Sequence, residues 1–345
     1  MQSSRVTSDG RFDDSRGSKE GRDIHVSRAR EHGRGRHARN PLQIPWLGWR
    51  DIILRTYAKM FSDRLFSVAG GAAFFILFAI FPAIAALISL YGLFLNPSTI
   101  TQRLSMANDL IPQDVLNLLR QQAARIASQS HGVLTIGFLA GLLVTFWSAM
   151  SGVKAMIDAL NVIYAQEEAR GLFRFNLVAF LFSMGGLAIF LIAIGAVAAV
   201  PLTLSWLGLG AISIDLMRIA RWPVLLIVLL LGLAVLYRHG PHRRPARWQW
   251  VSVGSVFASV LWIAASYLFS WYLAKFNSYN ATYGSLGAVV AMMMWLWIST
   301  CVVLLGAELN AEIEHQTADD STTGGDKPLG ERGAVMADTV GAKQE

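Results

Sequence analysis

The sequence predicts an all-α integral membrane protein with six transmembrane helices and one further helix on each membrane surface. Of its 345 residues, 54% are hydrophobic and only 15% are charged, whereas soluble proteins carry roughly 25% charged residues. The charged residues are concentrated at the two ends of the chain and in short loops between long apolar runs. Such runs are typical of helices that cross a hydrocarbon core of about 30 Å.

Residues 1–44 are predicted to be a disordered, basic, cytoplasmic tail. The first 40 are rich in Arg, Ser, Gly and Asp and nearly lack large apolar side chains, so they cannot bury enough surface to offset the loss of chain entropy. The next segment interleaves apolar and basic residues at helical spacing, which is typical of an amphipathic helix on a membrane surface. Its apolar residues are Ile52, Ile53, Tyr57, Met60 and Phe61, and its basic residues are Arg55, Lys59 and Arg64.

A membrane domain is predicted over residues 45–315, with six apolar runs. The runs are Val68–Leu95, Gly132–Gly152, Phe175–Val200, Trp222–Tyr237, Trp250–Leu273 and Ser285–Leu309. The fourth run is short, and the sequence leaves open whether its helix begins near Ile212 or near Trp222. Pro82 lies inside the first run, where it removes one backbone donor and is expected to kink the helix.

The distribution of Lys and Arg predicts the orientation of the spans. With the N-terminus inside, the short inside loops 153–174 and 238–249 hold 3 and 4 basic residues, whereas the outside loops 201–221 and 274–284 hold 2 and 1. Basic residues are enriched in cytoplasmic loops, so both termini are expected in the cytoplasm. Residues 316–345, rich in Thr, Gly and Asp, are predicted to be a second disordered tail.

The outside loop 96–131 contains a further amphipathic pattern, "IPQDVLNLLRQQAARIASQS". Pro112 suits the first turn of a helix, and one stripe of that helix would carry Val115, Leu119, Gln122 and Ile126. We therefore expect a periplasmic surface helix that packs on the outer face of the membrane or over the mouth of the bundle.

Three stretches carry a family resemblance. They are "AGGAAFFILFAIFPAIAALISLYGLF", "WSAMSGVKAMIDALNVIYAQEEARGLFRF" and "YNATYGSLGAVVAMMMWLWISTCVVLLGAELNAEIE". The chain resembles the YihY/BrkB family of bacterial inner-membrane proteins, formerly labelled ribonuclease BN, over roughly residues 45–315. The resemblance implies six helices with both termini in the cytoplasm. It implies no catalytic or binding residues, because the family offers none, and its ribonuclease label is regarded as a misassignment.

A polar rim is predicted at the outer end of the last span, where Asn280, Thr282 and Tyr283 precede a glycine-rich helix start. One interpretation is a cavity or substrate mouth lined by these side chains, with Asn280 and Tyr283 facing the mouth. The other is a tight turn with a helix cap and an interfacial tyrosine.

Ionisable residues at the inner ends of two spans are further candidates for a cavity lining. Glu308, Glu312 and His315 share one face of a continuing helix, and intramembrane carboxylates tend to be functional; the alternative is a solvated helix end. Lys154, Asp158 and Asn161 repeat this spacing after the second span, with Lys154 and Asp158 able to pair across one turn. They indicate a polar cluster inside the bundle or an ordinary helix extension.

Packing and lipid contacts are predicted at two further places. Gly137, Gly141 and Gly152 form a seam of small residues that lets helices approach closely, within the chain or between copies in a homo-oligomer. The short loop "YRHGPHRRPARW" holds Arg238, Arg243, Arg244 and Arg247, which are expected to attract anionic lipid headgroups or only to determine topology.

The sequence argues against several chemical functions. The single cysteine, Cys301, excludes an intramolecular disulfide and a zinc–thiolate site, and no cofactor or metal site is expected. The carboxylates that a metal-dependent nuclease would need are scattered, and the basic tail nearly lacks aromatic residues for stacking on nucleic acid, so no specific nucleic-acid partner is expected. No P-loop motif occurs. We therefore expect a protein that is not an enzyme.

These observations predict transport or translocation of a lipid-like or small envelope solute. They rest on the kink at Pro82, the polar residues at both ends of the last span, and an interior almost free of charge. A proton-coupled pump is less favoured, because no carboxylate lies in the middle of a span. The alternatives are a non-catalytic membrane scaffold or assembly partner and, least favoured, a membrane enzyme. The sequence does not indicate the substrate, the direction or the energy source of transport.

Overall fold

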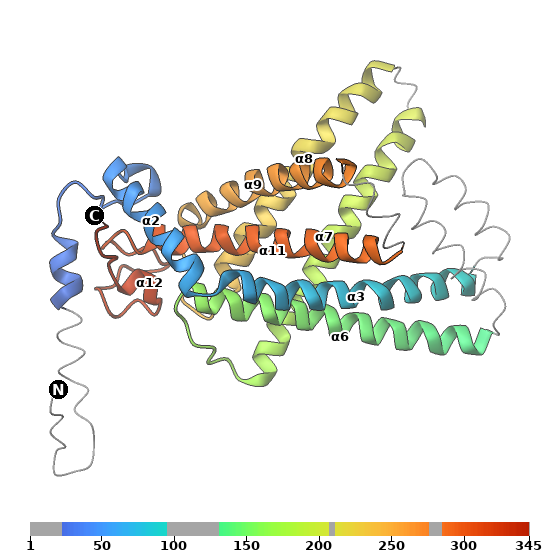
Figure 1. Ribbon diagram of the computed structural model, residues 1–345, viewed down its shortest axis with the longest axis horizontal. Coiled ribbons are helices and arrows are strands. Elements are labelled where there is room, and N and C mark those ends of the chain that lie inside the picture. Colours follow the sequence, from blue (N-terminus) through green and yellow to red (C-terminus); the bar gives the residue numbers. More distant parts are fainter. Residues whose placement is uncertain (1–22, 95–130, 207–210, 276–284, 345) are drawn as a thin grey trace, which may run out of the picture.

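The computed structural model describes residues 23–94, 131–206, 211–275 and 285–344, and these ranges are almost entirely helical (Figure 1). Within them no strand occurs, and the one bridge joins Ala246 to Thr322. The all-α class is thus confirmed. The elements are η1 (Pro41–Gln43), α2 (Trp46–Ser62), α3 (Leu65–Phe94), α6 (His131–Ile163), α7 (Leu172–Trp206), α8 (Ala211–His239), α9 (Trp248–Lys275), α11 (Ser285–Glu314) and α12 (Val335–Asp338).

Five of the described helices are long and apolar enough to cross a membrane. Their candidate spans are Leu65–Ala85, Thr135–Ile163, Leu172–Ile189, Trp248–Lys275 and Gly287–Glu314. The remaining long helix, α8, begins at Ala211, close to the earlier of the two expected starts, and its described apolar part is Leu225–His239. The expected surface helix in 96–131 and the rim residues Asn280, Thr282 and Tyr283 lie outside the described residues.

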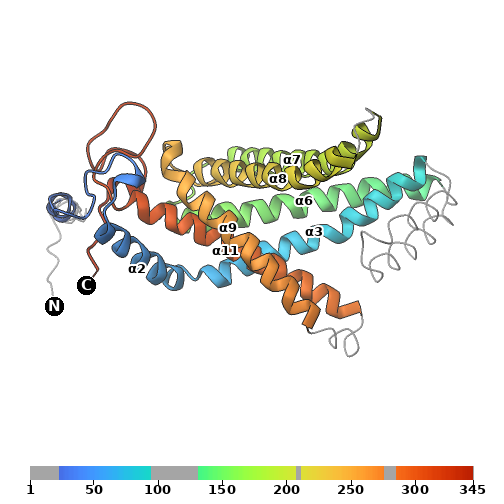
Figure 2. The ribbon, with the colours of Figure 1, turned by 90° about the horizontal axis from the view of Figure 1, so that it is seen from above.

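The long helices form three neighbouring pairs. Helices α3 and α6 run side by side, α9 packs on α11, and α7 packs on α8, while α11 also contacts α3 (Figures 1 and 2). Figure 2 shows that the α9–α11 pair diverges from the α3–α6 pair with distance from the two described ends of the chain, which lie at one end of the bundle. We call this the terminal end and the opposite one the distal end.

The α9–α11 crossing is close because two glycines face each other. A side chain added at Gly306 would lie 2.7 Å from the carbonyl oxygen of Gly254 and 2.6 Å from the hydroxyl of Tyr237. The Tyr237 hydroxyl donates to the carbonyl of Val303 over 2.7 Å. Asn310 adds two bonds to α9, because its side chain accepts from the Gly254 N–H and donates to the Val251 carbonyl.

Buried side chains concentrate in the half of the bundle nearest the terminal end. We define the distal halves as residues 74–85 of α3, 135–147 of α6, 260–275 of α9 and 287–295 of α11. In these described stretches Phe269 is the one buried side chain. Large apolar side chains such as Phe74, Leu143, Leu268 and Met293 are exposed there, so the described distal halves bury far fewer side chains than the terminal halves do.

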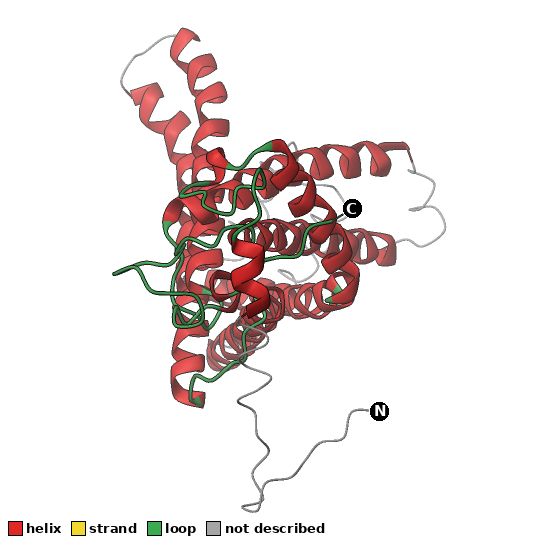
Figure 3. Cartoon of the chain, turned by 90° about the vertical axis from the view of Figure 1, so that its left-hand side faces the viewer, coloured by secondary structure: helices red, strands yellow, loops and turns green. Residues whose placement is uncertain are grey.

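The terminal end is covered by what we call the terminal cap, residues 23–45, 240–247 and 315–344. Viewed from that end, its loops lie across the ends of the helices (Figure 3). The structure therefore differs from the disorder expected for both tails, over residues 23–44 and 316–344. Arg36, Gln316, Thr317, Ser321 and Thr322 are all buried in the cap. The cap is ordered by polar contacts, which a composition poor in apolar residues does not reveal.

Candidate functional site at the terminal end of α11

Three glutamates on the last turns of α11 form the centre of the site. Glu308, Glu312 and Glu314 are each 0% exposed, which is unusual for carboxylates unless they are paired. Helix α11 continues without a break to Glu314, so these residues lie at the junction between α2 and the terminal cap, which includes the loop 240–247. Glu308 and Glu312 lie one turn apart, whereas Glu314 points to a different neighbour.

Glu312 is paired with Arg55 of α2. The Arg55 Nε lies 2.5 Å from a Glu312 carboxylate oxygen, and both side chains are almost completely buried. The same guanidinium donates to the Gln316 side chain over 2.7 Å and to the Ala342 carbonyl over 3.0 Å. His315 lies 3.5 Å from the same carboxylate. Arg55 therefore joins α2, the end of α11 and the C-terminal segment.

Glu314 is paired with Arg243 in a bidentate contact of 2.6 and 2.9 Å, and both side chains are fully buried. The Arg243 guanidinium also lies 3.9 Å from the ring centroid of Tyr164. Burial acts to lower the pKa of Arg243, but the charge of Glu314, the effect of Tyr164 and the hydrogen bonds to Glu314 together outweigh it and raise that pKa. Burial also raises the pKa of Tyr164 well above its usual range. Arg243 is therefore a permanent cation held between a carboxylate and an aromatic face.

Glu308 differs from its two neighbours because it has no partner. Both of its carboxylate oxygens are buried and accept no hydrogen bond among the described residues. The charged groups that act on it are Asp63, Glu312 and Lys59. Of these, Lys59 is partly exposed and lies 3.8 Å from Asp63. The hydroxyl oxygen of Thr56, on the buried face of α2, likewise lacks a partner.

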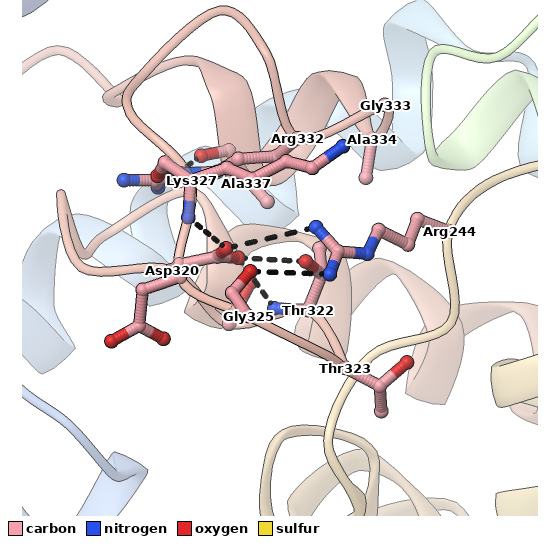
Figure 4. A network of polar contacts seen from close by, with 12 residues as sticks. Arg244, Asp320, Thr322, Thr323, Gly325, Lys327, Arg332, Gly333, Ala334 and Ala337 are labelled. Atoms are coloured by element: carbon pink, nitrogen blue, oxygen red, sulfur yellow. Dashed lines mark hydrogen bonds and ion pairs between the residues drawn. The ribbon is translucent and has the colours of Figure 1, made fainter.

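A second polar network holds the C-terminal segment to the loop 240–247 (Figure 4). Arg244 lies 3.9 Å from Asp320 and donates to the Gly325 carbonyl. Asp320 accepts bonds of 2.9 and 2.7 Å from the backbone and hydroxyl of Thr322, and one of 3.0 Å from the Lys327 N–H. Burial acts to raise the pKa of Asp320, but these hydrogen bonds outweigh it and lower the pKa.

The expected lipid-binding arginines are engaged within the chain. Arg243 is buried against Glu314 and is not available to a headgroup, so the structure differs from the expectation there. Arg247 lies 2.6 Å from Asp326, with about four-tenths of its side chain exposed. Arg238 lies 4.2 Å from the Trp248 ring. The physical reason is similar for Arg243, Arg244 and Arg247: the end of α11 supplies a carboxylate to the first, and the C-terminal segment supplies carboxylates and carbonyls to the other two, at the place where lipid was expected.

The expected cluster of Lys154, Asp158 and Asn161 is only partly formed. No ion pair joins Lys154 to Asp158 in the part of the chain that the structure describes, and Asp158 is exposed. Asn161 is buried, but it faces other groups. Its side chain donates to Glu168 over 2.9 Å and accepts from the His242 N–H over 2.7 Å. It therefore joins the end of α6 to the loop 240–247.

Of the three glycines in the expected seam, Gly152 lies at a close contact between α6 and α3. A side chain added there would lie 3.3 Å from Ile76 of α3. Gly137 is exposed and Gly141 half-buried, so the described residues leave this part of the seam uncovered. Pro82 lies inside α3, which is helical through it.

Sequence reasoning missed Arg36, Arg55, Tyr164, Gly306 and Asn310. Arg55 was placed among the basic residues of an amphipathic helix on the membrane surface, and Arg36 in a disordered tail. The missed signal is complementary charge: the N-terminal part and the loop 240–247 are basic, whereas residues 308–326 hold six carboxylates, Glu308, Glu312, Glu314, Asp319, Asp320 and Asp326. Among the described residues, no group of three or more His, Cys, Asp or Glu side chains is arranged to hold a metal ion.

The fold and the site together define an all-helical, multi-span membrane protein with a polar cap at one end. A family model described as virulence factor BrkB matches residues 56–329, and the chain belongs to this family. A protein named as ribonuclease-like, YfkH of Bacillus subtilis (strain 168), is 30% identical over 247 residues, which cover 65% of this chain and 85% of YfkH.

Two UPF0761 membrane proteins are also similar to the chain. One, from Aromatoleum aromaticum, is 26% identical over 78% of this chain and 65% of its own length. Another, from Vibrio vulnificus (strain YJ016), is 25% identical over 79% of this chain and 87% of its own length. No solved structure matches the chain at a significant level.

Proposed function

We propose that this protein moves a lipid-like amphiphile across the bacterial inner membrane, with the terminal cap on the cytoplasmic side. The observation that carries the proposal is the difference between the two halves of the bundle. The terminal half is packed and sealed by polar contacts, whereas the described distal halves expose apolar side chains and diverge (Figure 2).

The chemistry of the exposed surface indicates the substrate class. The described stretches of the distal halves hold no Asp, Glu or Arg, and Lys275 is the one basic residue, at the end of α9. An acyl chain is accommodated on such a surface at no electrostatic cost, whereas a charged solute loses its hydration there without a compensating partner. The proposal is therefore an amphiphile whose apolar part contacts the distal halves.

The contacts at the terminal end determine which helices must separate during transport. Arg55, Arg243 and Asn310 tie α2, α9 and α11 to one another and to the cap, so a substrate reaches the cytoplasmic leaflet only after these contacts separate. The structure corresponds, in this proposal, to a state that is closed toward the cytoplasm.

A lipid translocation assay tests the proposal. Purified protein is reconstituted in liposomes that contain a trace of fluorescent phospholipid, and dithionite is added to bleach the outer leaflet. Lipid from the inner leaflet is bleached only after it has moved to the outer leaflet. We expect this second loss of fluorescence to be faster than in protein-free liposomes. Equal rates in the two preparations would contradict the proposal for this lipid class.

A reversible cross-link supplies the matched control. Ala246 and Thr322 face each other across an antiparallel bridge, where opposed residues are close enough for a disulfide. In an Ala246→Cys/Thr322→Cys/Cys301→Ser variant, oxidation should slow translocation and reduction should restore it. Unchanged translocation in a fully oxidised sample would show that cap opening is not part of the cycle.

The proposal treats the protein as a transporter rather than an enzyme. The ribonuclease-like name belongs to YfkH and comes with no site in this chain that we can assign. We expect purified protein to leave RNA intact, with a catalytic ribonuclease as the positive control in the same assay.

A further inference from the structure

Glu308 is a buried acid that the closed packing does not pair. It lies on α11 one turn before Glu312 and is equally buried. Glu312 has Arg55 at 2.5 Å and His315 at 3.5 Å, whereas neither oxygen of Glu308 has a hydrogen-bond partner among the described residues. Two carboxylates on one helix face, four residues apart, are thus held in different ways.

The groups around Glu308 disfavour a negative charge on it. Two of the three charges that act on it, those of Asp63 and Glu312, are negative, and the third belongs to Lys59. Lys59 is partly exposed and lies 3.8 Å from Asp63. A buried carboxylate without a partner costs several kcal/mol relative to water. The neutral acid avoids this cost.

The cations of the neighbouring elements lie at the distal end or act on other carboxylates. Helix α3 has no charged residue, and the one charged residue of α9, Lys275, is at the distal end. Helix α6 brings Lys154, which acts on Asp158, while Tyr164, just after α6, is a neutral group whose hydroxyl has no hydrogen-bond partner among the described residues. Arg55 and Arg243 are held by Glu312 and Glu314.

We propose that Glu308 is a proton-binding site that holds one proton while α2 and α11 are packed and releases it when they separate. Separation admits water to the carboxyl group, which then ionises, and the proton passes to that water. Repacking of α2 on α11 requires one proton to return. Resting on the proposed function, this inference makes proton uptake and release the event that couples to opening of the terminal cap.

Infrared spectroscopy of the protein in lipid tests the site directly, because a protonated carboxyl group absorbs apart from carboxylates. At neutral pH we expect the wild type to show this band and Glu308→Gln to lack it. Glu167→Gln, which changes an exposed loop carboxylate, should keep it. Absence of the band from the wild type, or its persistence in Glu308→Gln, would overturn the proposal.

A second variant keeps the test valid if Glu308→Gln folds poorly. Glu308→Asp retains a carboxyl group but shortens it, so the band should shift in frequency rather than disappear. A band identical to that of the wild type would show that it arises from another residue.

Lipid translocation then separates the two proposals. The wild-type rate should depend on pH, and Glu308→Gln should lose that dependence. A band assigned to Glu308 in a protein that moves no lipid would support the proton site and contradict the transport proposal. Translocation without the band, at a rate independent of pH, would support transport and overturn the site.

Discussion

The two halves of this bundle are built from the same kind of helix but are held in different ways. Near the terminal cap, α2, α9, α11 and the loop 240–247 are joined by buried ion pairs, by Asn310 and by the glycine contact at Gly306. In the distal halves α3, α6, α9 and α11 expose large apolar side chains. Lipid is as apolar as these side chains, so burying them against each other has little driving force in a membrane.

The comparison shows that the arrangement of the helices is specified mainly at the terminal end. Polar contacts determine which helices meet at the terminal end, because each unpaired polar group would be costly there. The distal halves are free to change their spacing at little cost. The protein thus has one end that is fixed by polar contacts and one end where the spacing of the helices can vary.

Breaking the buried pair should have the largest effect. In Arg243→Ala the fully buried Glu314 loses both of its bidentate bonds, so the free energy of unfolding should fall by about 3–5 kcal/mol. The measurement is thermal or chemical unfolding of the purified protein. Arg247→Ala, which removes a pair to an exposed Asp326, should cost less than about 1 kcal/mol. Similar losses in both variants would contradict a cap held by its buried pair.

Enlarging a contact glycine should have an intermediate effect. The methyl group of Gly306→Ala would lie within 2.7 Å of the Gly254 carbonyl oxygen, and such overpacking costs about 1–3 kcal/mol. Gly186→Ala, in α7 with no neighbour within 4 Å of the added carbon, is the matched control and should not lose stability. Equal stability of the two variants would mean that α9 and α11 do not touch at this position.

Acidification should have the smallest effect, confined to the N-terminal part of the cap. Burial lowers the pKa of His25, whose Nδ1 accepts from the Val340 N–H over 3.1 Å. The folded state thus binds its proton less well than the unfolded state. The contact's contribution is present above the usual pKa of 6.5 and is lost as pH falls through the lower folded-state value.

Hydrogen exchange of residues 23–30 measures this effect. After correction for the intrinsic rate, protection should fall between about pH 7.5 and pH 5, by less than about 1 kcal/mol because His25 is partly exposed. His25→Gln should lack this change. Asp320, whose pKa lies below its usual value of 3.8, loses its contribution only at more acidic pH, so the two groups do not interfere.

Much of the fold could be predicted because it depends on hydrophobicity alone. The long apolar runs correspond to helices α3, α6, α7, α9 and α11, and the start of α8 agrees with one of the two positions considered. The site could be predicted only in part. Glu308 stands out as an ionisable residue in an apolar run, but its burial depends on α2, which the pattern placed on the membrane surface.

The terminal cap could not be predicted because it is held by specific geometry. Arg36 donates to the carbonyls of Gln316 and Gly341, and Arg55 to that of Ala342. Main-chain carbonyls are present at every residue, so no pattern of residue types reveals which of them an arginine will find. Residues 280–283, where a rim was expected, lie outside the described residues, so that expectation stays a prediction.

The pairing of these arginines has a consequence for how the chain is made. Glu312 and Glu314 lie at the end of α11 and are synthesised after the other described long helices, so Arg55 and Arg243 lack these partners while the earlier helices are being made. Basic residues near the ends of spans are the ones that bias topology. We therefore expect Arg55 and Arg243 to act twice: first as positive charges that bias the orientation of the nascent chain, and then as the buried partners of Glu312 and Glu314.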